Sequence, residues 1–281
     1  MKKESVLALF FVVALSCIGC VKTNVTVENS PLLRIATLAE ELCDGSDSLK
    51  LKRISNASVY CIYGEINSSV LAYFELEREK DYWESSIGSR ILVLNSTGGD
   101  VRSSLAIVDL LRVGSYDIVI PDSSYCLSSC ANYLFLGANK KVVSDHALIG
   151  WHGGIPTSKK QLAFMLNLNE NEESDIEEID FQWRAMANLV NENQRFLDSL
   201  GAKQSSLIYN LPKALDCVDI FDSSIGMQRL FWSPSLENLT TNYQIPGLYY
   251  KNSKYHNYDS VFFVRPDGYV KNWALEAGCS L

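Results

Sequence analysis

Short apolar runs alternate with amphipathic segments through the middle of the chain. Residues 59–63 and 91–94 are continuously apolar or aromatic, which predicts β-strands that are buried on both faces. Between them, residues 69–82 carry apolar side chains at helical spacing. The alternation continues with predicted helices at 101–111 and 127–136 and predicted strands at 116–120, 142–143 and 147–151. Strands and helices at this pitch predict an α/β fold, with βαβ units around a mostly parallel sheet.

The flanking regions are less regular. A helix is predicted at 33–42 and a long one at 176–200, after an acidic stretch at 170–175 that we interpret as its solvated N-terminus. Near the C-terminus, residues 261–264 and 269–270 flank the turn sequence Arg-Pro-Asp-Gly, which predicts a β-hairpin. The aromatic residues of this region either pack against one another or form a surface for a substrate or partner.

Composition narrows the functional classes. With 281 residues, of which 47% are hydrophobic, the chain is long enough to bury a full core. A net charge of −8 argues against nucleic acid as a partner, because phosphate binding needs a basic face. Three histidines without close Cys/His or Glu/His spacing predict no metal site, and the sequence contains no phosphate-binding loop. No cofactor is therefore expected.

The N-terminus predicts secretion. Lys2 and Lys3 precede the apolar run 6–15, which is too short to span a bilayer as a permanent helix and is typical of a secretory signal peptide. The residues that follow resemble a bacterial lipoprotein processing site, where a cysteine becomes the lipidated first residue. Cys17 fits the local pattern better, whereas Cys20 leaves an even number of cysteines behind it, so we favour Cys20. An ordinary cleaved signal without lipid is the alternative.

Lipidation at Cys20 predicts a periplasmic protein that is anchored to a membrane. Its oxidising compartment would allow disulfides. Six cysteines remain after residue 20, enough for three bridges: Cys43, Cys61, Cys126, Cys130, Cys217 and Cys279.

A glycine pair, a serine and a histidine each follow an apolar run between residues 95 and 152. Acyl transfer by serine needs a hydroxyl, a base and N–H donors where the oxyanion forms. Ser128 opens a predicted helix, and the N–H of Ser129 lies in its first turn without an intrahelical partner. Gly99 lets backbone approach a ligand and offers a second N–H. His152 ends a predicted strand and is the candidate base. Taken singly, each residue also has a common structural role.

In combination, these residues resemble the Clp protease family of the Clp/crotonase superfamily. The segment 95–99, Asn-Ser-Thr-Gly-Gly, is similar to the family's Asn-Ser-Pro-Gly-Gly turn. Residues 128–138 are similar to its nucleophile helix and residues 149–152 to its histidine strand. The resemblance covers residues 58–240 and is greatest to secreted bacterial Clp-like proteins. It implies a Clp/crotonase-like ββα spiral with a mostly parallel sheet.

The resemblance also implies roles for individual residues. Ser128 corresponds to the nucleophile, His152 to the general base, and the N–H groups of Gly99 and Ser129 to the oxyanion donors. Cys126 and Cys130 would then form a bridge across the nucleophile turn. The family's third acid has no counterpart, because the matching position is occupied by Gln-Arg at 228–229. The carboxylates that could substitute for it lie upstream: Asp216, Asp219 and Asp222.

We therefore expect an envelope-located serine hydrolase, a peptidase with peptide or protein substrates. The alternative is a non-catalytic Clp-like scaffold or binding protein at the envelope, and acyl-thioester chemistry is a third option. Relatives of this fold form trimers or rings, so a homo-oligomer is possible, whereas an ATP-driven partner is not expected outside the cytoplasm. The expected division is a signal peptide at 1–20, an N-terminal extension at 21–57, the Clp/crotonase-like domain at 58–240 and a β-rich C-terminal appendage at 241–281.

Overall fold

A mostly parallel sheet forms the centre of the molecule. The computed structural model describes residues 31–43, 49–54, 57–80, 90–112, 115–215, 230–251, 259–265 and 270–274. Its largest sheet has six strands in the order β1-β2-β3-β4-β6-β9. Only the β1–β2 pair is antiparallel. The predicted α/β fold with a mostly parallel sheet is confirmed. The strands are β1 Leu49–Ile54, β2 Ala57–Tyr63, β3 Arg90–Asn95, β4 Tyr116–Ile120, β6 Lys140–Val143 and β9 Leu248–Tyr250.

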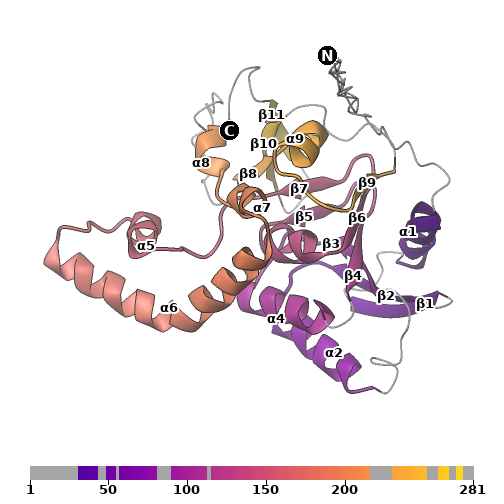
Figure 1. Ribbon diagram of the computed structural model, residues 1–281, viewed down its shortest axis with the longest axis horizontal. Helices are drawn as coiled ribbons and strands as arrows, with labels where there is room; N and C mark the ends of the chain where they lie inside the picture. Colours follow the sequence, from indigo (N-terminus) through magenta and orange to yellow (C-terminus); the bar gives the residue numbers. More distant parts are fainter. Residues whose placement is uncertain are drawn as a thin grey trace, which may run out of the picture.

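Helices cover both faces of this sheet (Figure 1). Helix α1, Pro31–Leu42, packs on the odd-numbered side chains of β2 and β3, such as Val59 and Val93. Helices α2, Ser68–Arg78, and α4, Val101–Arg112, share a core with the even-numbered side chains, such as Ile62 and Leu92. Side chains alternate between the faces of a strand, so both sets must be apolar in a covered sheet. This requirement explains the uninterrupted apolar runs.

Two smaller sheets extend from the end of β3. Strands β5, Tyr125–Leu127, and β7, Leu148–Gly150, pair in parallel. Strands β8, Leu230–Ser233, β10, Ser260–Val264, and β11, Val270–Ala274, form an antiparallel sheet in the order β11-β10-β8. Isolated bridges connect the layers, from Ser96 to Cys126 and from Trp151 to Trp232. A continuous path of backbone pairing therefore runs from the central sheet to the C-terminal strands.

The C-terminal region pairs with the rest of the molecule. The two strands of the predicted hairpin, β10 and β11, are antiparallel neighbours, which confirms their pairing. Strand β9 adds to the central sheet beside β6, and β10 pairs with β8. A division into a domain and an appendage at residue 240 stays a prediction.

The remaining helices follow the site region. They are the π-helix η1 Cys130–Phe135, α5 Lys159–Leu166, α6 Glu173–Ser199, α7 Ala202–Leu207, α8 Leu211–Leu215 and α9 Leu236–Thr241. Helix α6 confirms the long predicted helix, and together with α5 it projects from the body of the molecule (Figure 1). In the described ranges, no helix combines the length and the apolar character needed to cross a membrane.

The predicted helix at 127–136 needs a correction. Leu127 belongs to strand β5, Ser128 forms a turn, and helical structure begins at Ser129. The reason is a long-range contact, because the backbone N–H of Leu127 donates to the carbonyl of Ser96 at 3.0 Å. That bond extends the strand and delays the start of the helix.

Candidate active site

Three strands end at the candidate site. The Ser96 N–H donates to the Tyr125 carbonyl at 2.7 Å, which aligns the end of β3 with β5. Leu127 of β5 is in register with Gly150 of β7. Because these strands run in parallel, their carboxyl ends meet at one edge, where open α/β sheets commonly bind ligands. Ser128 directly follows the end of β5, His152 lies two residues after the end of β7, and the glycine pair begins three residues after the end of β3.

Ser128 occupies a tight turn with left-handed backbone geometry. Its φ angle is 54°, a region that costs a non-glycine residue roughly 1–2 kcal/mol. The turn is held by two backbone bonds, from Ser128 N–H to the Gly150 carbonyl at 3.0 Å and from Asn132 N–H to the Ser128 carbonyl at 2.8 Å. A disulfide between Cys126 and Cys130 closes the turn, which confirms the predicted bridge. Strain at a single residue is a feature of functional sites when the surroundings enforce it.

His152 meets the hydroxyl of Ser128. The distance from His152 Nε2 to Ser128 Oγ is 2.6 Å. The imidazole and the ring of Phe231 of β8 form a T-shaped pair, with centroids 5.2 Å apart and an interplanar angle of 84°. Burial lowers the pKa of His152 below its usual value of 6.5, and an interaction with its own backbone opposes this shift. The imidazole is therefore neutral at pH 7, the form that can accept a proton.

The glycine turn lies against the serine turn. Gly98 has a φ angle of 92° and Gly99 one of 142°. A Cβ atom on Gly98 would lie 2.8 Å from Ser128 Cβ and 2.9 Å from the backbone nitrogen of Ser129. On Gly99 it would lie 2.3 Å from the Ile66 carbonyl oxygen. Both positions therefore exclude any side chain.

One backbone N–H group in each of these two turns has no acceptor among the described residues. Within the described ranges, neither the N–H of Gly99 nor that of Ser129 donates to a protein acceptor. The neighbouring Gly98 N–H, in contrast, is bound by Ser96 Oγ at 3.1 Å. Unpaired donors beside a serine and a neutral histidine can stabilise an oxyanion.

The three candidates for a third acid, Asp216, Asp219 and Asp222, lie outside the described residues, in the range 216–229. Across the part of the chain that the structure describes, no carboxylate forms a hydrogen bond with the His152 ring. His146 pairs with Asp122 instead, Nδ1 to Oδ1 at 2.8 Å, and its side chain is 72% exposed. That pair is a surface contact, and His256 is not among the described residues.

The sequence interpretation missed two residues at the site. Asn132 is 2% exposed, and its Nδ2 donates to the Gly153 carbonyl at 2.7 Å. Phe231 contributes the aromatic wall beside His152. A polar residue on the buried face of the predicted helix, four positions after Ser128, was a signal for Asn132. Phe231 had no signal, because its position depends on the pairing of β8.

The other cysteines are partly accounted for. Cys43 and Cys61 form a second disulfide, which attaches α1 to β2. Cys17, Cys20, Cys217 and Cys279 lie outside the described ranges, as does the predicted signal peptide. In the described residues, no group of three or more His, Cys, Asp or Glu side chains could hold a metal ion.

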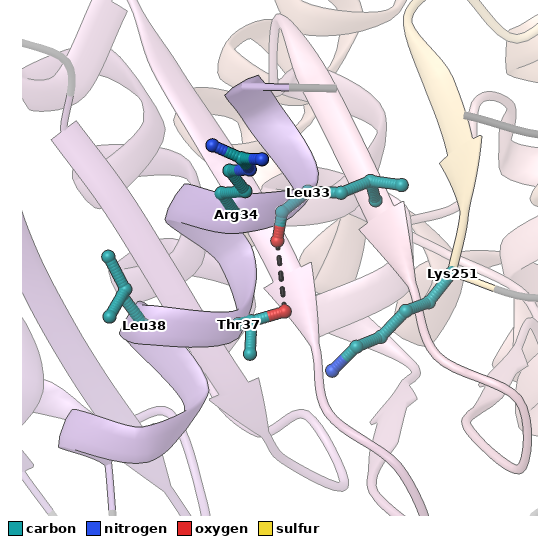
Figure 2. A pocket seen from close by; sticks show the side chains of 5 residues that line it. All are labelled: Leu33, Arg34, Thr37, Leu38 and Lys251. Carbon is teal, nitrogen blue, oxygen red and sulfur yellow. Dashed lines mark hydrogen bonds between the residues drawn. The ribbon is translucent and has the colours of Figure 1, made fainter. Parts of the chain in front are cut away.

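A separate hollow of about 430 Å³ lies beside α1. Figure 2 shows its lining, with Leu33, Arg34, Thr37 and Leu38 on α1 and Lys251 reaching in from the end of β9. Lys251 Nζ pairs with Glu40 and Thr37 Oγ1 donates to the Leu33 carbonyl, so the lining contains no nucleophile paired with a base. The hollow is therefore not the candidate active site.

Comparisons with known proteins give limited matches. No protein-family model matches the sequence, and no curated protein matches it. Matching solved structures include two of the 1510-N membrane-bound stomatin-specific protease, a serine mutant and a lysine mutant in complex with a substrate peptide. Both are 22% identical, with a TM-score of 0.27, and cover 34% of this chain. The matches span 44% and 42% of those proteins, less than half of their length. Beyond the mixed α/β sheet, the resemblance to the Clp fold stays a prediction.

Proposed function

We propose that this protein is a serine hydrolase of the cell envelope, a peptidase, in which Ser128 is the nucleophile and His152 the general base. The observation that carries the proposal is the 2.6 Å separation of His152 Nε2 and Ser128 Oγ. A nucleophile and its base must lie within hydrogen-bond reach, and this distance meets that condition. The lowered pKa of His152 adds the second requirement, a base that is unprotonated at neutral pH.

The proposed reaction follows from these two groups. Nε2 of the neutral imidazole accepts the Ser128 proton while Oγ bonds to the carbonyl carbon of a peptide. The carbonyl oxygen becomes an oxyanion, and the N–H groups of Gly99 and Ser129 donate to it. The protonated imidazole then gives its proton to the leaving amine as the C–N bond breaks. Water, deprotonated by His152, hydrolyses the resulting ester and restores Ser128.

The oxyanion donors have a measurable role in this scheme. Loss of one donor typically lowers the rate about 10²–10³-fold. Neither of the two proposed N–H groups has a competing protein acceptor within the described residues, so no hydrogen bond has to break before they donate to the oxyanion. A preorganised donor is more effective than one that must first break a bond.

The proposal includes a setting and a third acid. Lipidation at Cys20, or at Cys17, would anchor the mature protein to a membrane and present the site to the periplasm. The domain at 58–240 would have the ββα spiral of the Clp/crotonase superfamily, with the C-terminal strands as an appendage, and would assemble as a homo-oligomer. One of Asp216, Asp219 and Asp222 would orient His152. To identify the acid, each of the three aspartates is replaced in turn by asparagine. The substitution that lowers the reactivity of Ser128 marks the residue that orients His152.

The test is covalent labelling of the purified protein with a fluorophosphonate, which reacts with activated serines. We expect one label per chain, at Ser128, and none in Ser128→Ala. Ser123→Ala is the matched control, because Ser123 has a nearly identical φ angle of 57° but its hydroxyl contacts Asp122 instead of a histidine. The control should label like the wild type. Absence of labelling in the wild type, or labelling that survives Ser128→Ala, would refute the proposal.

A non-catalytic scaffold or binding protein is the second candidate. It is favoured by one observation, that no described carboxylate bonds to the His152 ring. An unlabelled but folded protein that binds an envelope partner would support it. Labelling at Ser128 would decide against it, because a scaffold has no need for an activated serine.

A further inference from the structure

We propose that Asn132 is a positioning residue that holds His152 against Ser128. This inference rests on the proposed serine hydrolase function and extends it to a residue outside the Ser-His pair. The inference is based on two hydrogen bonds that Asn132 donates. The backbone N–H of Asn132 donates to the Ser128 carbonyl at 2.8 Å, and its side-chain Nδ2 donates to the Gly153 carbonyl at 2.7 Å.

His152 is fixed firmly on its N-terminal side. Trp151 and Trp232 exchange two backbone hydrogen bonds, at 2.9 Å and 2.7 Å, which tie the residue before His152 to strand β8. The indole of Trp151 is fully buried. One end of the histidine backbone therefore has little freedom.

The backbone on the C-terminal side of His152 is less restrained. Gly153 and Gly154 follow it, and Gly153 has a φ angle of 120°. A Cβ on Gly153 would meet nothing within 4 Å, so packing does not restrain this residue. Gly154 packs closely, since a Cβ there would lie 2.9 Å from Ile208 Cγ2, so the conformational freedom lies at Gly153 itself. The side chains that hold this loop are Asn132, at the Gly153 carbonyl, and Tyr209, whose hydroxyl donates to the Ile155 carbonyl at 2.8 Å.

Of these two side chains, Asn132 bonds closer to His152 along the chain, and it is also the one that bonds to Ser128. It lies in η1, the π-helix that begins just after Ser128. Turns of π-helix are frequent at functional sites. Since one buried residue bonds to the backbone of Ser128 and to the residue after His152, it sets the spacing between the two. A misplacement of about 1 Å can lower a rate roughly 10²-fold.

The half-satisfied amide argues against a role in stability alone. Asn132 is 2% exposed, and its Oδ1 is buried without a hydrogen-bond partner. A buried polar atom left unpaired destabilises the folded state, and an apolar residue of similar size would avoid that cost. Groups of this kind are expected where function rather than stability determines the residue.

A double-mutant cycle on the full-length protein tests the inference. The readout is the limiting rate of fluorophosphonate labelling at Ser128, separated from probe affinity by varying the probe concentration. Asn132→Ala should lower the limiting rate about 10–100-fold with probe affinity little changed. In a His152→Ala background, the same substitution should change the residual rate less than about twofold, because a residue that acts through His152 has nothing left to position.

Two further variants keep the cycle interpretable. Asn132→Asp preserves side-chain volume and, when ionised, cannot donate to the Gly153 carbonyl, so it should also slow labelling and replaces Asn132→Ala if that variant does not fold. Asn238→Ala is the matched control, because Asn238 is 9% exposed, lies in α9, and its Nδ2 donates to Asp259 at 2.7 Å instead of to the loop after His152. It should lower the melting temperature and leave the labelling rate unchanged.

The outcomes separate this inference from the proposed function. An unlabelled wild type refutes the function, and the inference with it. A labelled wild type with normal labelling of Asn132→Ala or Asn132→Asp refutes the inference alone. An equal loss in the wild-type and His152→Ala backgrounds also refutes it, because the substitution would then act on the Ser128 turn and not through His152.

Discussion

Removal of the Cys126–Cys130 disulfide should affect reactivity more than stability. The bridge spans four positions in sequence and encloses Leu127, Ser128 and Ser129. Both cysteines are fully buried. Exchange of both cysteines for alanine removes the covalent closure of the turn that holds Ser128 at a φ angle of 54°. The turn then depends on the backbone bonds to Gly150 and Asn132.

The second disulfide provides the comparison of magnitudes. Cys43 and Cys61 are separated by 18 positions, compared with four for the site pair. Loop-closure entropy grows with the logarithm of loop length, which gives about 2 kcal/mol for the short loop and about 3 kcal/mol for the long one. Loss of the Cys43–Cys61 bridge should therefore lower the free energy of unfolding more. Its effect on labelling should be small, because it joins the end of α1 to β2 and lies outside the turn that carries Ser128.

The assay measures both quantities on both double alanine variants. Urea denaturation gives the free energy of unfolding, and fluorophosphonate labelling under native conditions gives the reactivity of Ser128. We expect opposite rankings, with the Cys126/Cys130 variant more stable but labelled about 5–30-fold more slowly. A residue released from a left-handed conformation gains roughly 1–2 kcal/mol, which corresponds to that loss. If the Cys126/Cys130 variant labels at the wild-type rate, the bridge does not maintain the nucleophile turn.

Two more perturbations address the base and the oxyanion donors. The labelling rate should rise with pH as His152 loses its proton, with a midpoint below 6.5, and Phe231→Ala should raise that midpoint towards 6.5 because water then reaches the ring. A pH–rate profile measures both, and an unchanged midpoint would contradict the assigned cause. Gly99→Ala should lower the labelling rate about 100-fold, since its Cβ would lie 2.3 Å from the Ile66 carbonyl oxygen and displace the N–H. Gly64→Ala, also at positive φ but in open space, is the control, and equal losses at both glycines would refute the steric reasoning.

Features that depend on neighbouring residues were predictable from the sequence. The strands β3 and β4 could be predicted because they are buried on both faces and their sequences are therefore apolar without a break. Helix α4 could be predicted because its apolar side chains recur at helical spacing, and Asp100 just before it caps the helix by accepting the Ser103 N–H at 2.8 Å. Each of these signals comes from side chains a few positions apart.

Features that depend on distant residues were not predictable. Strand β1 alternates leucine with lysine and arginine, and it forms as the antiparallel edge partner of β2. Strand β9 has three residues, which pair with β6 about a hundred positions earlier. Leu127 reads as the start of a helix, yet its bond to Ser96 makes it the end of a strand. In each case a hydrogen bond to a remote strand overrides the local preference.

The same distinction applies to the site. The sequence alone identified the candidate chemistry, with the glycine pair, Ser128 and His152 each at the end of an apolar run, and it indicated the cysteine pair around the serine. Tertiary structure decided the 2.6 Å contact between His152 and Ser128, the bond from Asn132 to Gly153 and the packing of Phe231 on the imidazole. A short segment of sequence determines which residue types are present and how they are spaced along the chain. The distances between segments arise only when strands pair and helices pack, so they depend on the whole fold.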